Sequence, residues 1–290
     1  MRSSVSFLVV VLIIGQLLTG LVLAQNGQPF PKQGELPFGD LAFQRTIDKQ
    51  CGPAGSSSIL QKVAQTKAKN NFWETTQPVS IDFGTFRELE DKTNAGIADQ
   101  TIHTVPITQH HQTVLFPADR TELGITHNGT SYKEGTLVTL EAFIVRSQYA
   151  DTKYNSYHGT GEEVNCGQPW LTWNDIHIDL GITKDAAQCD RVTAEISPHF
   201  RPKVWDRFQD GSEPKINHIV RKLPLVGQKV RLTGQLFYDS SHKACKDGQS
   251  QGAPVRMTIW EIHPVYRVEI LDKITNEWLD LDKWVAKNHL

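Results

Sequence analysis

The sequence lacks the compositional extremes that mark several protein classes. It contains only 4 cysteines among 290 residues, and its formal net charge is -2. So few cysteines exclude a densely disulfide-bonded miniprotein, and near-neutral charge argues against broad electrostatic capture of nucleic acid. With 39% hydrophobic and 21% charged residues, the chain is not collagen-like, coiled-coil or largely disordered. The composition is that of an ordinary globular protein.

Short catalytic and cofactor-binding motifs are also missing. The sequence has no GxGxxG or P-loop for a nucleotide cofactor, no GxSxG for a serine nucleophile and no HExxH for zinc. No two cysteines are separated by only two residues, which excludes a zinc ribbon and a thioredoxin-like site. A structural role for the cysteines is therefore favoured over a catalytic one.

The first 24 residues differ from the rest and predict a signal peptide. A cation at Arg2 precedes an apolar run from Phe7 to Leu23, and small residues precede a cleavage site before Gln25. An uncleaved N-terminal anchor is the alternative. No later apolar stretch approaches membrane length, so we expect no membrane span after cleavage. The predicted location is periplasmic or extracellular, where disulfides form.

Between the signal peptide and residue 131 the sequence predicts little regular structure. Residues 25–45 are rich in Gly, Pro and Gln at their start and indicate an extended leader. Residues 46–130 predict a helical and irregular region, with short helices at 56–68 and 80–91. The segment 95–130 has no clear period and is expected to be loop or irregular.

From residue 131 to 272 the pattern changes to one of strands. Alternation of apolar and polar residues predicts five strands, at 136–147, 175–180, 191–196, 229–238 and 256–271. A helix-compatible stretch at 199–222 lies between the third strand and the fourth. Pro264 suggests a bend or bulge in the last strand. This order is that of the OB-fold, a five-stranded Greek-key barrel. The fold class is therefore mainly β with helical additions, and residues 273–290 are expected to form a helix packed on the barrel.

Several phrases resemble a family of exported bacterial proteins of unknown function with an OB-like C-terminal barrel. They are IDKQCG, AKNNFW, GEEVNC, NDIHIDL, ISPHFRPKVW, GQLFYDSSH and WEIHPVYRVEI, between residues 47 and 270. Some relatives carry a cysteine where this chain has Trp73, which implies that Cys51 lacks that partner. The resemblance implies export and an OB-like barrel, and it brings no activity, substrate or catalytic residue.

Two long connections are the candidate ligand-binding segments. In OB-folds the loops after the first and fourth strands border the usual ligand face. Here these loops, 148–174 and 239–254, carry the candidate ligand-binding residues Tyr154, Tyr157, His158, Trp170, Trp173, Asp239 and His242. Alternatively, the aromatic residues cover the barrel mouth. The charge balance favours a saccharide or peptide ligand, because an oligonucleotide needs a basic groove.

Histidines in the strands suggest a second kind of site. His177 and His263 alternate with apolar residues of their strands and so belong to a polar face. Together with Glu195 and His242 they form a candidate divalent-metal set, with Zn²⁺ as the favoured ion. Such a metal could activate water for phosphodiester or ester hydrolysis, with Glu261 or Asp175 as general base. The alternative is that each histidine is satisfied by ordinary hydrogen bonds.

We therefore favour an exported binding or interaction module without a certain cofactor. Its partner would be a small polymer or a protein. A metal-dependent hydrolase and a structural envelope protein are the alternatives. Cys166 follows the first long loop and Cys189 precedes the third strand, so a Cys166–Cys189 disulfide could pin that loop, although spacing alone leaves all three pairing schemes open.

Overall fold

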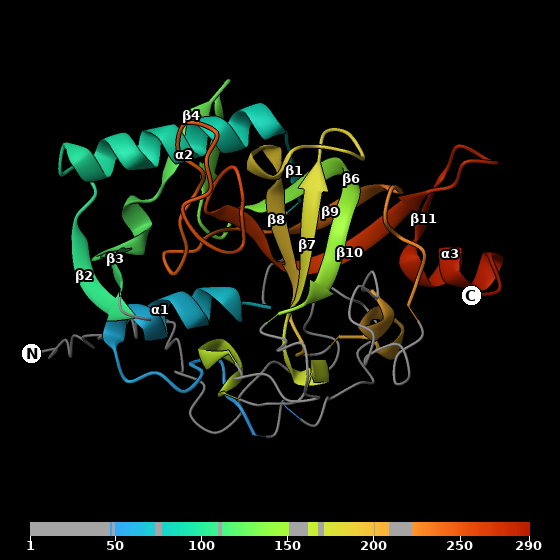
Figure 1. Cartoon of the computed structure of the whole chain (residues 1–290), viewed down its shortest axis with the longest axis horizontal. Helices are drawn as coiled ribbons and strands as arrows, with labels where there is room; N and C mark the ends of the chain where they lie inside the picture. The colour runs from blue at the N-terminus through green and yellow to red at the C-terminus, as the bar shows by residue number, and fades with distance from the viewer. Residues whose placement is uncertain are drawn as a thin grey trace, which may run out of the picture.

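The computed structural model describes residues 47, 50–72, 77–109, 112–150, 162–167, 171–199, 201–208 and 222–290 (Figure 1). The predicted signal peptide and extended leader, residues 1–45, lie outside these residues. Among the residues described, no helix is both long and apolar enough to cross a membrane.

Five strands close into a barrel. Strand β6 pairs antiparallel with β7 and β9, β7 pairs antiparallel with β8, β8 pairs parallel with β10, and β10 pairs antiparallel with β9. The order β6-β7-β8-β10-β9 and back to β6 is that of an OB-fold, which confirms the predicted fold class. The strands are β6 Leu137–Tyr149, β7 Ile176–Gly181, β8 Val192–Ile196, β9 Lys229–Tyr238 and β10 Trp260–Leu271.

Alternation along the strands separates an apolar barrel interior from a polar outer face. In β7, Ile176, Ile178 and Leu180 are fully buried in the hydrophobic core. Because successive strand residues point to opposite faces, His177 lies on the other side of this strand. Strand β8 repeats the pattern, with Glu195 opposite the core residue Ala194. The polar face predicted from the sequence is therefore the outside of the barrel.

The last barrel strand is irregular near Pro264, as the sequence suggested. Its register against β9 shifts between Ile262 and Val265 and again before Arg267. At this irregularity β10 passes close to Gly234 of β9. A Cβ added at Gly234 would lie 2.5 Å from the carbonyl oxygen of Pro264. Only glycine fits without a backbone shift.

Gly234→Ala should therefore destabilise the barrel by about 1–3 kcal/mol, the usual cost of forcing a group into a packed interior. Urea unfolding measures this effect. Gly252→Ala is the matched control, because an added Cβ there meets no atom within 4 Å. Equal unfolding midpoints for the two variants would contradict the close approach.

The N-terminal region contains two helices and a strand. Helix α1 spans Leu60–Lys69, strand β1 spans Val79–Ile81 and helix α2 spans Phe83–Ala98. The second helix, which the sequence predicted at 80–91, therefore begins and ends later in the chain than predicted. It begins after Asp82, whose side chain accepts a 2.7 Å hydrogen bond from the backbone N–H of Thr85 and so caps the helix.

Two hairpins follow where the sequence predicted irregular structure, so that prediction is wrong for most of 95–130. Strands β2 Thr104–Gln109 and β3 Gln112–Pro117 pair antiparallel, as do β4 Gly124–His127 and β5 Thr130–Lys133. The first hairpin buries its own small apolar cluster, which includes Ile107, Val114 and Phe116. The second turns at Asn128-Gly129, both with positive φ.

Two other helix predictions are only partly met. Within 199–222 the described residues contain the 3₁₀ helix η6, Lys203–Arg207, and residues 209–221 lie outside the described part. At the C-terminus a short strand, β11 Trp278–Asp280, pairs with β10 before helix α3, Leu281–Lys287. Leu281 and Trp284 of α3 belong to the barrel core.

Candidate functional site

Three neighbouring strands bring histidine and carboxylate side chains together on the outer face of the barrel. His177 of β7 is directly opposite Glu195 of β8, and its Nε2 lies 3.0 Å from Glu195 Oε1. In the next strand, His263 Nδ1 lies 2.8 Å from Glu195 Oε2. Glu195 therefore occupies the centre of this group. It is fully buried, as is His263.

Helix α1 covers this face and adds a cation to it. Lys69, the last residue of the helix, places Nζ 3.1 Å from Glu195 Oε2, 3.7 Å from Glu261 Oε1 and 3.9 Å from Asp239 Oδ2. One turn earlier, Gln65 Nε2 donates a 3.1 Å hydrogen bond to Asp239 Oδ1. The end of α1 is thus fixed to the barrel by buried polar contacts.

The connection after β9 supplies the next part of the network. Asp239 pairs with the ring Nδ1 of His242 and lies 3.3 Å from Arg256 Nη2. Arg256 Nη1 also donates a 2.7 Å hydrogen bond to Glu261 Oε2 in β10. Arg256 is almost fully buried, and both carboxylates are buried completely. This side of the network is therefore a closed chain of ion pairs.

The connection before β7 completes the group. The backbone N–H of Asp175 donates to Glu162 Oε2 at 3.0 Å, and Asn165 Nδ2 donates to Asp175 Oδ1 at 3.3 Å. Asp175 Oδ2 lies 3.9 Å from His263 Nε2. We call the following residues the buried polar cluster: Lys69, Asp175, His177, Glu195, Asp239, Arg256, Glu261 and His263.

Glu195 and Lys69 of the cluster both favour their charged forms. Burial alone raises the pKa of Glu195, but His177 and Lys69 outweigh it and hold that pKa well below its ordinary value. Burial alone lowers the pKa of Lys69. The negative charges of Glu195, Asp239 and Glu261 outweigh burial and raise this pKa well above its ordinary value. Likewise, Glu195 and Glu162 overcome the burial of His177 and raise its pKa.

Three other members of the cluster, Asp175, Glu261 and His263, favour their neutral forms. Burial, reinforced by neighbouring carboxylates, raises the pKa of Asp175 and of Glu261. Burial, together with the charge of Lys69, lowers the pKa of His263. His263 is therefore the neutral imidazole of the cluster, with a lone pair on one ring nitrogen.

Of the four residues predicted as metal ligands, the structure brings together His177, Glu195 and His263. His242 instead pairs with Asp239, at the edge of the network. Sequence reasoning did not identify Lys69 and Arg256, because an isolated cation in a helix or a loop carries no signal of burial. It named Asp175 and Glu261 as possible bases, and both lie in the cluster.

The predicted ligand-binding residues are spread over both long connections. Tyr154, Tyr157, His158 and Trp170 lie outside the described residues. Trp173 is half-buried in the 3₁₀ helix η4, Leu171–Trp173. Asp239 is fully buried and faces the cluster rather than solvent, whereas His242 remains 28% exposed.

The cysteine pairing differs from the predicted one. The disulfides join Cys51 to Cys166 and Cys189 to Cys245, so the predicted Cys166–Cys189 bond is wrong. Cys166 belongs to a segment that packs on the N-terminal region, where the backbone N–H of Ser56 donates to the carbonyl of Glu163 at 3.0 Å.

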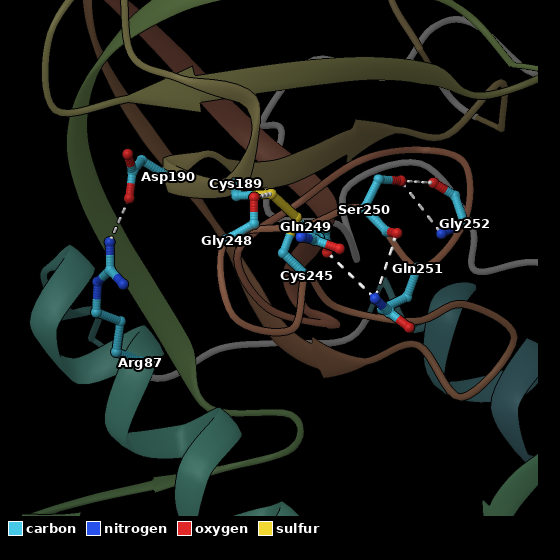
Figure 2. Close-up of a disulfide and its surroundings, with 9 residues drawn as sticks. All are labelled: Arg87, Cys189, Asp190, Cys245, Gly248, Gln249, Ser250, Gln251 and Gly252. Carbon is cyan, nitrogen blue, oxygen red and sulfur yellow. Dashed lines mark hydrogen bonds and ion pairs between the residues drawn. A yellow bond between two sulfur atoms is a disulfide. The ribbon is translucent and has the colours of Figure 1, made fainter.

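Cys189 instead lies beside the connection after β9, as Figure 2 shows. The backbone of Met257 in that connection donates a 2.8 Å hydrogen bond to the carbonyl of Arg191, two residues after Cys189. Each disulfide therefore pins one of the two long connections, and each to a different part of the molecule.

Comparisons with known proteins add little to this description. No protein-family model matches the chain, and no curated protein matches it in sequence. Among solved structures, a chain of the crystal structure of yeast Stn1 and Ten1 aligns over 74% of this chain and 74% of its own length, with 10% sequence identity and a TM-score of 0.27. The barrel is therefore identified by its own strand order.

Proposed function

We propose that the protein is an exported OB-barrel binding module whose ligand contacts come from its two long connections. The observation that supports this most is that both connections contact the same helix, α1. Lys62 of α1 forms a 2.8 Å ion pair with Glu163 in the first, and Gln65 binds Asp239 at the start of the second. In OB-folds these two loops border the ligand face.

Export is supported by the cysteines and the N-terminal sequence. All four cysteines are joined in disulfides, which persist in oxidising compartments outside the cytosol. The first 24 residues read as a signal peptide, and the resemblance to exported bacterial proteins agrees with that interpretation. A periplasmic or extracellular location is therefore part of the proposal.

The proposed class of ligand follows from the helix and the charged side chains that occupy the outer face of β7 and β8. The outer face of β7 and β8, used by many OB-folds, is here covered by α1 and carries Glu195 and Asp179. A phosphate backbone would meet carboxylates there, and the formal net charge of -2 adds no attraction. We therefore propose a saccharide or peptide, bound by the connections rather than by the strand face.

Trp173→Ala should weaken binding of such a ligand about tenfold, because one aromatic contact contributes on the order of 1 kcal/mol. The mature protein is tested on a glycan array and a peptide array, with single-stranded oligonucleotides alongside, and calorimetry then measures the affinity of the variants. Trp278→Ala in β11 is the matched control, since that ring stacks on Arg231. Tight oligonucleotide binding, or equal affinities for the two tryptophan variants, would contradict the proposal.

A metal-dependent hydrolase is the second candidate function, and one observation favours it. Asp175, Glu195 and His263 each place a donor atom within 4.8 Å of those of the other two. At the edge of the cluster, the His177 and Glu162 side chains keep 13% and 18% of their surface exposed, which marks the side from which a substrate could approach. Hydrolysis of a phosphodiester that appears with added metal and disappears on chelation would support this candidate.

A further inference from the structure

The turn between β4 and β5 carries a chain of polar side chains that neither candidate function uses. The carboxylate of Glu88 in α2 contacts Nδ1 of His127, and Nε2 of the same ring lies 2.8 Å from Asn128 Nδ2. Because an ionised carboxylate only accepts hydrogen bonds, the ring proton is on Nδ1 and Nε2 keeps its lone pair. Nε2 therefore accepts a hydrogen bond from the Asn128 amide, and the chain runs from carboxylate to imidazole to amide.

Water reaches every group of this chain. The side chains of His127 and Glu88 are 32% and 34% exposed, and Asn128 and Gly129 are exposed at the tip of the turn. A Cβ added at Gly129 would meet no atom within 4 Å, so the described residues leave open space beside this glycine. The turn is therefore accessible to a reaction that consumes water.

An asparagine followed by a glycine holds an electrophile and a nucleophile next to one another. The backbone nitrogen of Gly129 can attack Cγ of Asn128, which closes a five-membered succinimide ring and expels Nδ2 as ammonia. Glycine favours this step because it has no Cβ to hinder the approach. Water then opens the ring at either carbonyl and leaves aspartate or isoaspartate. The net reaction converts a side-chain amide and one water into a carboxylic acid and ammonia.

We propose that Asn128 is a site of self-catalysed deamidation, with His127 as the catalytic residue and Glu88 as the positioning residue behind it. The attacking nitrogen of Gly129 loses one proton, and the leaving nitrogen must gain one before it departs as ammonia. Nε2 of His127 lies 2.8 Å from that leaving nitrogen, so it takes up the proton and passes it on. Glu88 orients the ring and stabilises the imidazolium that forms between the two transfers.

The turn has to open before the attack. Asn128 and Gly129 have φ values of 49° and 78°, the left-handed geometry of a tight hairpin turn. The strands β4 and β5 have only four residues each, so this hairpin opens locally at a lower cost than the barrel. Isoaspartate adds one carbon to the backbone, which does not fit the same turn. We therefore expect β4 to pack less tightly on α2 after the reaction.

A second turn of the same geometry supplies a control within the chain. Asp247 and Gly248 have φ values of 52° and 73°, and the flanking Lys246 and Gln249 exchange two backbone hydrogen bonds of 2.9 Å. A Cβ added at Gly248 also meets no atom within 4 Å. The residue before this turn is a lysine in place of a histidine. Asp247→Asn therefore gives an asparagine–glycine pair at both turns, and only the first pair follows a histidine.

The test follows amide loss at both turns in the mature, disulfide-bonded Asp247→Asn protein at neutral pH. Mass spectrometry of peptides gives each rate from the change in mass when the amide becomes a carboxylate. Position 128 should react at least ~10-fold faster than position 247, since one positioned proton-transfer group contributes on the order of 10²–10⁴ in enzymes. Adding His127→Gln should lower the rate at position 128 to that at position 247.

Further variants separate catalysis from loosening of the hairpin. Glu88→Gln should slow the reaction at position 128 in part, because the ring remains but its imidazolium loses the compensating charge. Free imidazole should raise the rate at position 128 in His127→Ala more than it does at position 247. Amide hydrogen exchange in β4 measures how often the turn opens in each variant. The proposal is overturned if position 128 reacts no faster than position 247, or if His127→Gln leaves the rate at position 128 unchanged or raises it.

Discussion

Glu195→Ala should lower the free energy of unfolding by about 3–5 kcal/mol, the usual cost of removing one partner of a buried ion pair. The reason is that Lys69 and His177 would keep their charges in a buried site without the carboxylate that compensates them. Lys69 is 3.1 Å from Glu195 and its side chain is only 9% exposed. Urea unfolding in the presence of EDTA measures the effect without any contribution from metal.

A surface ion pair provides the comparison for this variant. Glu141 of β6 forms a 3.2 Å pair with Lys229, and both side chains are well exposed, at 48% and 38%. Glu141→Ala should therefore cost less than about 1 kcal/mol. The double variant Glu195→Ala with Lys69→Met should recover part of the loss, because it removes the buried charge as well as its partner. A Glu195→Ala protein no less stable than Glu141→Ala would show that the cluster does not hold the fold together.

Removal of the Cys51–Cys166 disulfide should be comparably damaging. It joins residues 115 apart in sequence, and closing a loop of that length corresponds to about 5 kcal/mol in the loop-entropy model. The double variant Cys51→Ala with Cys166→Ala should also loosen α1 over the cluster, because the bridge ties the segment before α1 to the connection before β7. Amide hydrogen exchange in α1 should therefore become faster.

The second disulfide is the matched control for this effect. Cys189–Cys245 joins residues 56 apart, and its removal should cost about 4 kcal/mol by the same model. This bond joins the segment just before strand β8 to the connection after β9. Its removal should lower the unfolding midpoint while α1 exchanges at its original rate relative to the rest of the chain. If both variants accelerated exchange in α1 equally, the first disulfide would have no special role over the cluster.

The barrel could be predicted from the sequence because its strands alternate sharply. DIHIDL and RVTAEI place every second residue in the core, and this period identifies a strand from a few residues. The sequence did not predict the hairpin β4–β5, although Asn128-Gly129 is a strong turn signal, because the segments on either side of this turn are short and weakly apolar. Its strands have only four residues each.

The composition of the site was harder to predict than the fold. Lys69 and Glu195 are 126 residues apart in sequence, and nothing local to Lys69 indicates that it becomes buried against a strand. The same applies to the cysteines, since pairing depends on which loops the fold brings together. The alternation of side chains along each strand could place His177 and His263 on one polar face. Only the strand order shows that Glu195 lies between them.

The closed barrel also limits how another protein could bind. A partner peptide can join a β-sheet by strand addition only where an edge strand offers unpaired backbone groups. The five barrel strands pair in a ring, and beyond it β6 is extended by β1 and β10 by β11, each of only three residues. Within the described part of the chain, edges this short give little support to an added strand. At the barrel sheet, recognition through loops and side chains is therefore favoured over recognition through shared backbone hydrogen bonds.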